Sequence, residues 1–330
     1  MDSTRAELYE RVRRNIGNTP YVELQGLDIP NRCKVFAKAE YRNPTGSHYD
    51  REMWRFLRAL EEDRVIQPGV TRMIETTTGN SGASFAWLCR ALGYPPPTIV
   101  LPEDMPYARR AQIQSFGARL ILSPAGQYIT GVSETFGRLI QEHVVGRDGG
   151  GLWCPKHWED TRSGVAAMRE CGEEILRDSK RARCPLDFFV VALGNGSSSR
   201  GIGDALIPEN VTLVGMEPAE SPIVAEYLNL PGFTEPRTGD RQHGLIGTGP
   251  AKVDQIYVNM RKAAPTLSDI VHPTTEECAH MQTQLMDRAS QHVGMSSAGC
   301  VVSILRYIEQ NSIKNKNFGT VFYDPAWKYL

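Results

Sequence analysis

A glycine-containing segment, Glu75–Gly82 (ETTTGNSG), stands directly after a strand-like run and before a helical pattern. Its two glycines let backbone N–H groups approach an anion closely, and its hydroxyl side chains add further donors. The segment therefore predicts a carboxylate held at a helix N-terminus. The predicted carboxylate-binding residues are Thr77, Thr78, Gly79, Asn80 and Ser81. An ordinary glycine-rich turn between a strand and a helix is the alternative.

A second such segment, Leu193–Gly203 (LGNGSSSRGIG), also follows a strand-like run. Closely spaced glycines followed by a helix form a nest of N–H groups that suits a phosphate. The predicted phosphate-binding residues are Gly194, Asn195, Gly196, Ser197 and Ser198. A dinucleotide-binding fingerprint fits less well, because the glycine spacing differs from that motif.

A third segment, Asn43–Arg51 (NPTGSHYDR), reads as a turn followed by a helix start. Ser47 is a good N-cap, and Asp50 adds negative charge to the first helical turn. Taken alone, the segment is an ordinary capped helix start.

Together these segments resemble those of the fold-type II pyridoxal-phosphate (PLP) enzymes, the group that includes cysteine synthase and cystathionine β-synthase. Segment 43–51 is similar to that family's Asn-Pro-x-Gly-Ser-x-Lys-Asp-Arg, with Tyr49 at the position of the lysine. The resemblance implies that this lysine holds PLP as a Schiff base and moves the substrate's α-proton. A phenol cannot condense with an aldehyde, so Tyr49 cannot form that link.

The resemblance extends to the other segments. Segment 77–82 is similar to the family's loop for the substrate carboxylate, in which an asparagine, here Asn80, also contacts the cofactor's ring hydroxyl. Segment 194–198 is similar to the family's phosphate cup, with Ser197 in place of a glycine. The end of the sequence, 324–330 (DPAWKYL), is similar to Asp-Ser-Gly-Glu-Arg-Tyr-Leu, so Pro325 stands at the former cofactor-ring site, where the family has a serine that bonds the pyridine nitrogen.

Further matches follow in the family's order, so that the resemblance spans about residues 15 to 330. They are Asn15–Pro20, Leu101–Glu103, Phe116–Ala118, Val214–Pro218 and Ser296–Gly299. The resemblance predicts an α/β fold with two domains, mainly parallel sheets flanked by helices, and a cleft that keeps both anion-binding loops. It implies a small mobile domain of residues 46–150, a large domain of residues 1–45 and 151–330, and a homodimer.

The pattern along the chain agrees with that architecture, because strand-like and helical segments alternate, as in parallel sheets covered by helices. Predicted strands are 34–39, 72–75, 98–101, 120–122, 187–193, 212–217 and 320–323. Predicted helices are 50–62, 81–92, 107–116, 128–143, 161–178 and 275–292. Residues 146–151 are the most linker-like stretch, and residues 230–249 are rich in loop formers.

Composition excludes several other classes of function. The 330 residues include 37 basic and 38 acidic residues with no basic stripe, so nucleic acid is a poor partner. The seven cysteines contain no Cys-x-x-Cys pair, which favours free thiols and argues against a metal site. The sequence contains no run of about 18 apolar residues, which a membrane-spanning helix would need. Its first residues lack the apolar core of a signal peptide. We therefore expect a cytoplasmic protein.

If the chain is catalytic, another group must move the proton. Tyr49 is one candidate, although phenols ordinarily ionise near pH 10 and act better as acids than as bases at neutral pH. His48 is its neighbour but would point about 100° away on a helix, as a packing or surface histidine does. Lys156, beside His157, falls where the family has a loop near the substrate; a solvated loop lysine is the alternative.

Three functions remain open. The chain is a divergent enzyme for elimination, replacement or condensation on an amino-acid-like substrate, with PLP bound noncovalently or absent. Alternatively, it is an inactive homologue that binds the C-terminal tail of a protein partner, as cysteine synthases do. The third alternative is a conventional PLP-dependent β-replacement enzyme with an introduced lysine-to-tyrosine change at Tyr49. Pro325 argues against the third, because two departures at one bound molecule indicate natural divergence.

Overall fold

The structure, a computed structural model, describes residues 1–142, 151–160, 162–228, 243–248 and 267–330. The chain divides into two units by its internal contacts. Unit 1 comprises Met1–Gly17, Asn43–Ser163 and Trp327–Leu330, and unit 2 comprises Asn18–Arg42 and Gly164–Ala326.

Unit 2 is built on a six-stranded sheet with the strand order β1-β2-β9-β6-β7-β8. Its strands are β1 (Tyr21–Glu23), β2 (Lys34–Ala39), β6 (Phe188–Ala192), β7 (Thr212–Met216), β8 (Asp269–Val271) and β9 (Asn317–Phe322). Only β1 and β2 pair antiparallel; the other neighbours are parallel. The central strands are almost continuously apolar, as in Phe188–Ala192, because helices cover both faces.

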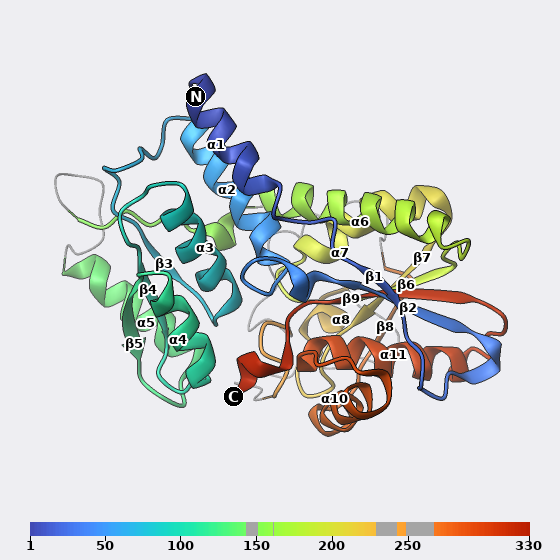
Figure 1. The fold of residues 1–330 in the computed structure, drawn as a ribbon. Helices are drawn as coiled ribbons and strands as arrows, with labels where there is room; N and C mark the ends of the chain where they lie inside the picture. Colours follow the sequence, from blue (N-terminus) through green and yellow to red (C-terminus); the bar gives the residue numbers. More distant parts are fainter. Residues whose placement is uncertain (143–150, 161, 229–242, 249–266) are drawn as a thin grey trace. The chain divides into compact units, whose positions relative to one another are not determined.

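The helices of unit 2 are α6 (Ser163–Arg181), α7 (Ser197–Leu206), α8 (Ile223–Leu228), α10 (Thr275–Ala289) and α11 (Met295–Gln310). Helices α6 and α7 lie on one face of the sheet, and α10 and α11 lie on the other (Figure 1). Apolar side chains from both layers, such as Ile175 and Val301, pack with Val190 and Val214 in one buried cluster. At the start of α10, Thr274 and Glu277 form a reciprocal capping box.

Unit 1 contains a parallel three-stranded sheet of β3 (Ile74–Thr76), β4 (Thr98–Pro102) and β5 (Arg119–Ser123), in that order. Its helices are α1 (Ser3–Arg13), α2 (Tyr49–Glu62), α3 (Asn80–Ala91), α4 (Tyr107–Ser115) and α5 (Tyr128–Gln141). Helix α3 packs against both α2 and α4. Ile74, Val100, Val132 and Phe136 form a buried cluster between the sheet and α5.

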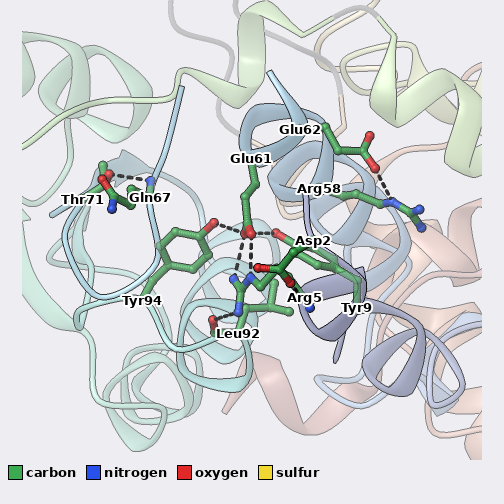
Figure 2. A network of polar contacts seen from close by, with 10 residues as sticks. All are labelled: Asp2, Arg5, Tyr9, Arg58, Glu61, Glu62, Gln67, Thr71, Leu92 and Tyr94. Carbon is green, nitrogen blue, oxygen red and sulfur yellow. Dashed lines mark hydrogen bonds and ion pairs between the residues drawn. The ribbon is translucent and has the colours of Figure 1, made fainter. Parts of the chain in front are cut away.

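A buried polar network fixes α1 on unit 1 (Figure 2). The Arg5 guanidinium donates to both Glu61 carboxylate oxygens, at 2.5 and 2.7 Å, and to the Leu92 carbonyl oxygen at 2.5 Å. The Tyr9 hydroxyl donates to Glu61 Oε2 at 2.9 Å, and the Tyr94 hydroxyl donates to the same oxygen. Helices α1 and α2 and the turn after α3 are therefore joined at one carboxylate.

The alternating pattern located most of these elements. All seven predicted strands and all six predicted helices overlap observed ones, and the predicted mainly parallel sheets are confirmed. Sequence patterns did not predict α1, α8, α11, β1 or β8. Most of the linker-like stretch 146–151 and most of the loop 230–249 lie outside the described residues.

The predicted small domain, residues 46–150, falls within unit 1, which also includes residues 43–45 and 151–163. At the two ends of the chain, residues 1–17 and 327–330 likewise belong to unit 1 rather than to the larger unit. The network at Glu61 holds the first of these segments, and contacts of Lys328, described below, hold the second.

Candidate functional site

The predicted carboxylate-binding loop joins β3 to α3 in unit 1. Gly79 has φ of 136°, and a Cβ atom there would come within 2.7 Å of the Arg109 side chain, so the position requires glycine. The Thr77 hydroxyl accepts the backbone N–H groups of Gly79 and Gly82 at 2.9 and 3.1 Å and lies 2.7 Å from the Ser81 hydroxyl. Thr77 therefore shapes the loop from within.

The segment Trp327–Leu330 contacts this loop, which the sequence did not predict. Lys328 Nζ lies 2.9 Å from Asn80 Oδ1, and the Lys328 side chain is fully buried. Arg109, also buried, donates to the Lys328 and Thr78 carbonyl oxygens at 3.2 and 3.0 Å, and its guanidinium stacks over the Tyr329 ring. Two cationic side chains, Lys328 and Arg109, therefore hold the loop in place.

Tyr49 begins helix α2, next to the buried carboxylate of Asp50. Asp50 accepts hydrogen bonds from the Thr45 backbone N–H at 2.7 Å, the Thr45 hydroxyl at 2.6 Å and the Ser84 hydroxyl at 2.6 Å. Burial raises the pKa of Asp50, although its hydrogen bonds and the positive charge of Lys328 act against that rise. Because Ser84 belongs to α3, Asp50 ties the segment that carries Tyr49 to the helix that follows the carboxylate-binding loop.

The surroundings of Tyr49 differ in one respect from the expected helix start. The capping position is His48, which makes no side-chain capping bond, and the Ser47 hydroxyl accepts the Tyr49 backbone N–H at 3.2 Å. The His48 and Tyr49 rings lie 4.4 Å apart between centroids. His48 Nε2 is 3.6 Å from Glu52 Oε1, so His48 pairs along its own helix.

Lys156 lies at the surface, where its Nζ is 3.1 Å from Glu159 Oε1 and its side chain is 48% exposed. The adjacent His157 is placed differently. His157 Nδ1 lies 3.1 Å from Glu75 Oε2, the same oxygen accepts the His157 backbone N–H at 3.1 Å, and the Glu75 side chain is fully buried. Glu75 stands two residues before Thr77 of the predicted carboxylate-binding loop, so a largely buried His–Glu pair stands beside that loop. A glutamate within the predicted strand 72–75 was the available signal for it.

The His157–Glu75 pair predicts a pH-dependent contribution to stability. Burial alone would lower the pKa of His157, but the Glu75 carboxylate outweighs burial and raises the pKa above the ordinary 6.5. The contribution is therefore full below pH 6.5 and is lost as pH rises through the folded-state pKa. We therefore expect the urea unfolding midpoint of a His157→Gln variant to be lower than that of the wild type. The difference between the two midpoints should be larger at about pH 5.5 than at about pH 9.

Lys156→Gln is the matched control, because its exposed pair contributes less than about 1 kcal/mol and gains no charge over this range. An NMR titration that places the His157 pKa below 6.5 would contradict the prediction.

The predicted phosphate-binding loop joins β6 to α7 in unit 2. Gly196 has φ of 97°, and Asn195 Oδ1 accepts the Ser197 backbone N–H at 3.0 Å, so the chain turns into the first turn of α7. A Cβ atom on Gly194 would lie 2.5 Å from the Gly247 carbonyl oxygen, which leaves room only for glycine. The Ser197 hydroxyl is buried and has no hydrogen-bond partner within the described part of the chain. An anion with acceptor oxygens at this helix N-terminus would satisfy it.

Pro325, also in unit 2, follows β9 and forms an isolated antiparallel bridge with Val293. The flanking backbone bonds are Gly294 N–H to the Asp324 carbonyl and Ala326 N–H to the His292 carbonyl, at 2.8 and 3.0 Å. Proline offers no side-chain donor or acceptor at this place. The nearby Tyr323 hydroxyl accepts the Ala192 N–H at 3.0 Å and so links β9 to β6.

The described residues offer neither a metal-binding cluster nor a membrane-spanning helix. No group of three or more histidine, cysteine or acidic side chains there could hold a metal ion. All seven cysteines are free thiols. Within the same ranges, no helix has the length and apolar character needed to span a bilayer.

Comparisons with known proteins agree with this arrangement. The family model described as "Pyridoxal-phosphate dependent enzyme" matches residues 12–324. Cysteine synthase B of Campylobacter jejuni is 33% identical over 328 residues, which covers 98% of each chain. A cysteine synthase of Staphylococcus aureus is 30% identical over 218 residues, covering 66% of this chain and 67% of the relative.

Solved structures support the fold as well. The crystal structure of a cysteine synthase from Entamoeba histolytica has a TM-score of 0.80 and is 24% identical, with 100% of this chain and 91% of that chain covered. Similarity at this level of identity establishes the fold and leaves activity to the residues of the site. The predicted α/β architecture is thereby confirmed.

Proposed function

Because this chain belongs to the family of pyridoxal-phosphate dependent enzymes, we propose that it is a divergent cysteine synthase-like enzyme for amino-acid-like substrates. The reaction is an elimination, a replacement or a condensation, and it proceeds without a lysine–PLP link. One observation carries the proposal: segments 77–82 and 194–198 keep geometries suited to anions, whereas Tyr49 stands at the lysine position.

The residues of this chain suit the phosphate of PLP better than they suit its aldehyde and its ring nitrogen. The loop 194–198 suits the phosphate, because glycine is required at Gly194 and a buried Ser197 hydroxyl lacks a partner within the described ranges. Tyr49 offers no amine and Pro325 offers no bond to a ring nitrogen, so neither fits the family's attachment. Charge-assisted hydrogen bonds at the phosphate can hold PLP noncovalently. When bound, PLP supplies an electron sink for a carbanion.

The residues of the chain then have separate tasks. Backbone N–H groups at the start of α3, together with the Thr78 and Ser81 hydroxyls, bind and orient the substrate carboxylate, and Thr77 holds the loop in shape. The Tyr49 phenol donates a proton or orients the substrate, since phenols are better acids than bases at neutral pH. Lys156 is a weaker candidate for the base than the sequence suggested, because its ammonium pairs with Glu159 at the surface. We also propose the homodimer that the resemblance implies and the cytoplasmic location that the free cysteines favour.

A noncatalytic binder is the second candidate function. Loss of the lysine and of the ring-nitrogen partner at Pro325 favours it, since a carboxylate-binding loop alone suffices to hold the C-terminal tail of a partner protein. An introduced change at Tyr49 remains the third candidate, and Pro325 argues against it.

The mode of PLP binding tests the proposal directly. We expect the purified protein to bind added PLP, seen by its absorbance, and to lose it on dialysis. Borohydride reduction after dialysis should leave the intact mass unchanged. A Gly194→Ala variant should bind PLP about tenfold or more weakly, because the added methyl displaces the loop from its charge-assisted bonds.

Gly137→Ala is the control, because nothing lies within 4 Å of a Cβ atom at that position. A reduced PLP adduct on any lysine would overturn the noncovalent proposal. Equal PLP affinity in both glycine variants would exclude the loop 194–198 as the phosphate site.

A further inference from the structure

Lys328 is a fully buried cation in the segment Trp327–Leu330. Burying an ammonium is costly unless charges and hydrogen bonds compensate for the lost water. The structure supplies both, since Lys328 Nζ lies 2.9 Å from Asn80 Oδ1 and its charge acts on the buried Asp50 carboxylate. These contacts tie the buried ammonium of Lys328 directly to Asn80.

The contact with Lys328 determines which way the Asn80 amide faces. An ammonium group has donors and no acceptor, so its partner on Asn80 is the amide oxygen and not the amide nitrogen. The NH₂ group is therefore on the other side of the amide. Asn80 is the first residue of α3, where backbone N–H groups also point out of the helix.

The segment that carries Lys328 is attached at several other points of the same unit. The Ala108 backbone N–H donates to the Leu330 carbonyl oxygen at 3.1 Å. Arg109 bonds the Lys328 and Thr78 carbonyl oxygens together, at 3.2 and 3.0 Å. The backbone of Lys328 and the backbone of the loop thus share one guanidinium, which fixes the ammonium against Asn80.

We propose that Lys328 is a positioning residue that holds Asn80 as a hydrogen-bond donor, so that the loop 77–81 selects a free carboxylate over an ester. An Asn80 amide that presents its NH₂ group beside a buried cation favours an anion, whereas a neutral ester would lack charge-assisted bonds. The inference rests on the proposed function and specifies its substrate class: amino acids with an unmodified α-carboxylate.

Calorimetric titration with L-serine and with L-serine methyl ester tests the role of Lys328. The measured quantity is the ratio of the two dissociation constants in the full-length protein. We expect wild type to favour L-serine and Lys328→Met to lower that preference about tenfold or more, through loss of the fixed amide. Lys328→Arg should keep the preference, because a guanidinium also offers only donors. General damage to the fold would weaken both ligands alike and leave the ratio unchanged.

A second variant keeps the inference testable if Lys328→Met does not fold. Asn80→Asp retains an oxygen for Lys328 but replaces the NH₂ donor with an acceptor, so the preference for L-serine should again fall. If wild type binds neither compound, the proposed function fails. If wild type prefers L-serine and neither Lys328→Met nor Asn80→Asp lowers that preference, the proposed function stands and the role of Lys328 is wrong.

Discussion

A Glu61→Gln variant should unfold at a much lower urea concentration than the wild type, with a loss of about 3 kcal/mol in the free energy of unfolding, as expected when a buried ion pair loses one partner. The Glu61 carboxylate accepts both donors of the Arg5 fork and two tyrosine hydroxyls. Neutralising it leaves the Arg5 guanidinium in a largely buried place without its counter-charge. The measurement is urea unfolding at neutral pH.

Glu62→Gln is the matched control, since Glu62 is the next residue of the same helix (Figure 2). Its carboxylate pairs with Arg58 at 2.9 Å across one helical turn, and its side chain is 47% exposed. Removing that pair should cost less than about 1 kcal/mol. Equal losses in the two variants would show that the Glu61 network does not hold α1 in place.

The dependence of stability on pH is a second test of the Glu61 network. Burial alone would raise the pKa of Glu61, but hydrogen bonds from Arg5, Tyr94 and Tyr9 outweigh burial and lower it below 4.5. The stability that the charged form contributes is therefore present above pH 4.5 and is lost as pH falls through the folded-state pKa. The difference in free energy of unfolding between the wild type and Glu61→Gln should therefore become smaller as the pH is lowered.

Local signals in the sequence predicted the framework well. Strands such as β4 and β6 are short apolar runs, and helices such as α2 show a clear apolar face, so each is recognisable without its neighbours. The two predicted anion-binding loops rest on the same kind of local signal, because their glycines stand at strand-to-helix junctions. Observed φ values of 136° at Gly79 and 97° at Gly196 explain why glycine occupies those junctions.

The elements that sequence patterns missed lack such local signals. Strand β1 has three residues, and β8 has three residues that acquire their conformation from pairing with β7. Helix α11 begins with small and polar residues, Ser296–Gly299, which are buried because the helix packs against the sheet. Tertiary packing determines the conformation of these segments, and their sequences show no periodicity from which it could be predicted.

The polar contacts of the site were the least accessible to sequence reasoning. Arg5 and Glu61 are 56 positions apart, and Lys328 and Asn80 are 248 positions apart. The Asp50–Ser84 bond and the Glu75–His157 pair are likewise long-range. Residue types identify such groups as candidates, but only the folded chain decides which carboxylate meets which cation.

Tyr49→Phe should abolish most of the proposed activity while sparing ligand binding. The substitution removes one hydroxyl and keeps the ring that packs 4.4 Å from the His48 ring. General acid–base groups commonly contribute about 10²–10⁴-fold in rate, so we expect a fall of that size in acetate release from O-acetyl-L-serine with PLP added. Tyr107→Phe is the matched control, because Tyr107 is 74% exposed on α4 of the same unit.

Measuring both the reaction rate and the ligand affinities of Tyr49→Phe distinguishes a role of Tyr49 in the chemical step from a role in binding. A slower reaction with unchanged affinity for PLP and L-serine assigns the phenol to the chemical step, because a group needed only for binding would raise the dissociation constants instead. An unchanged rate would mean that another group moves the proton, and the buried His157–Glu75 pair beside the carboxylate-binding loop is then the next group to replace. If the wild type binds L-serine but releases no acetate, the noncatalytic binder becomes the better account, since the anion-binding loops would serve recognition alone.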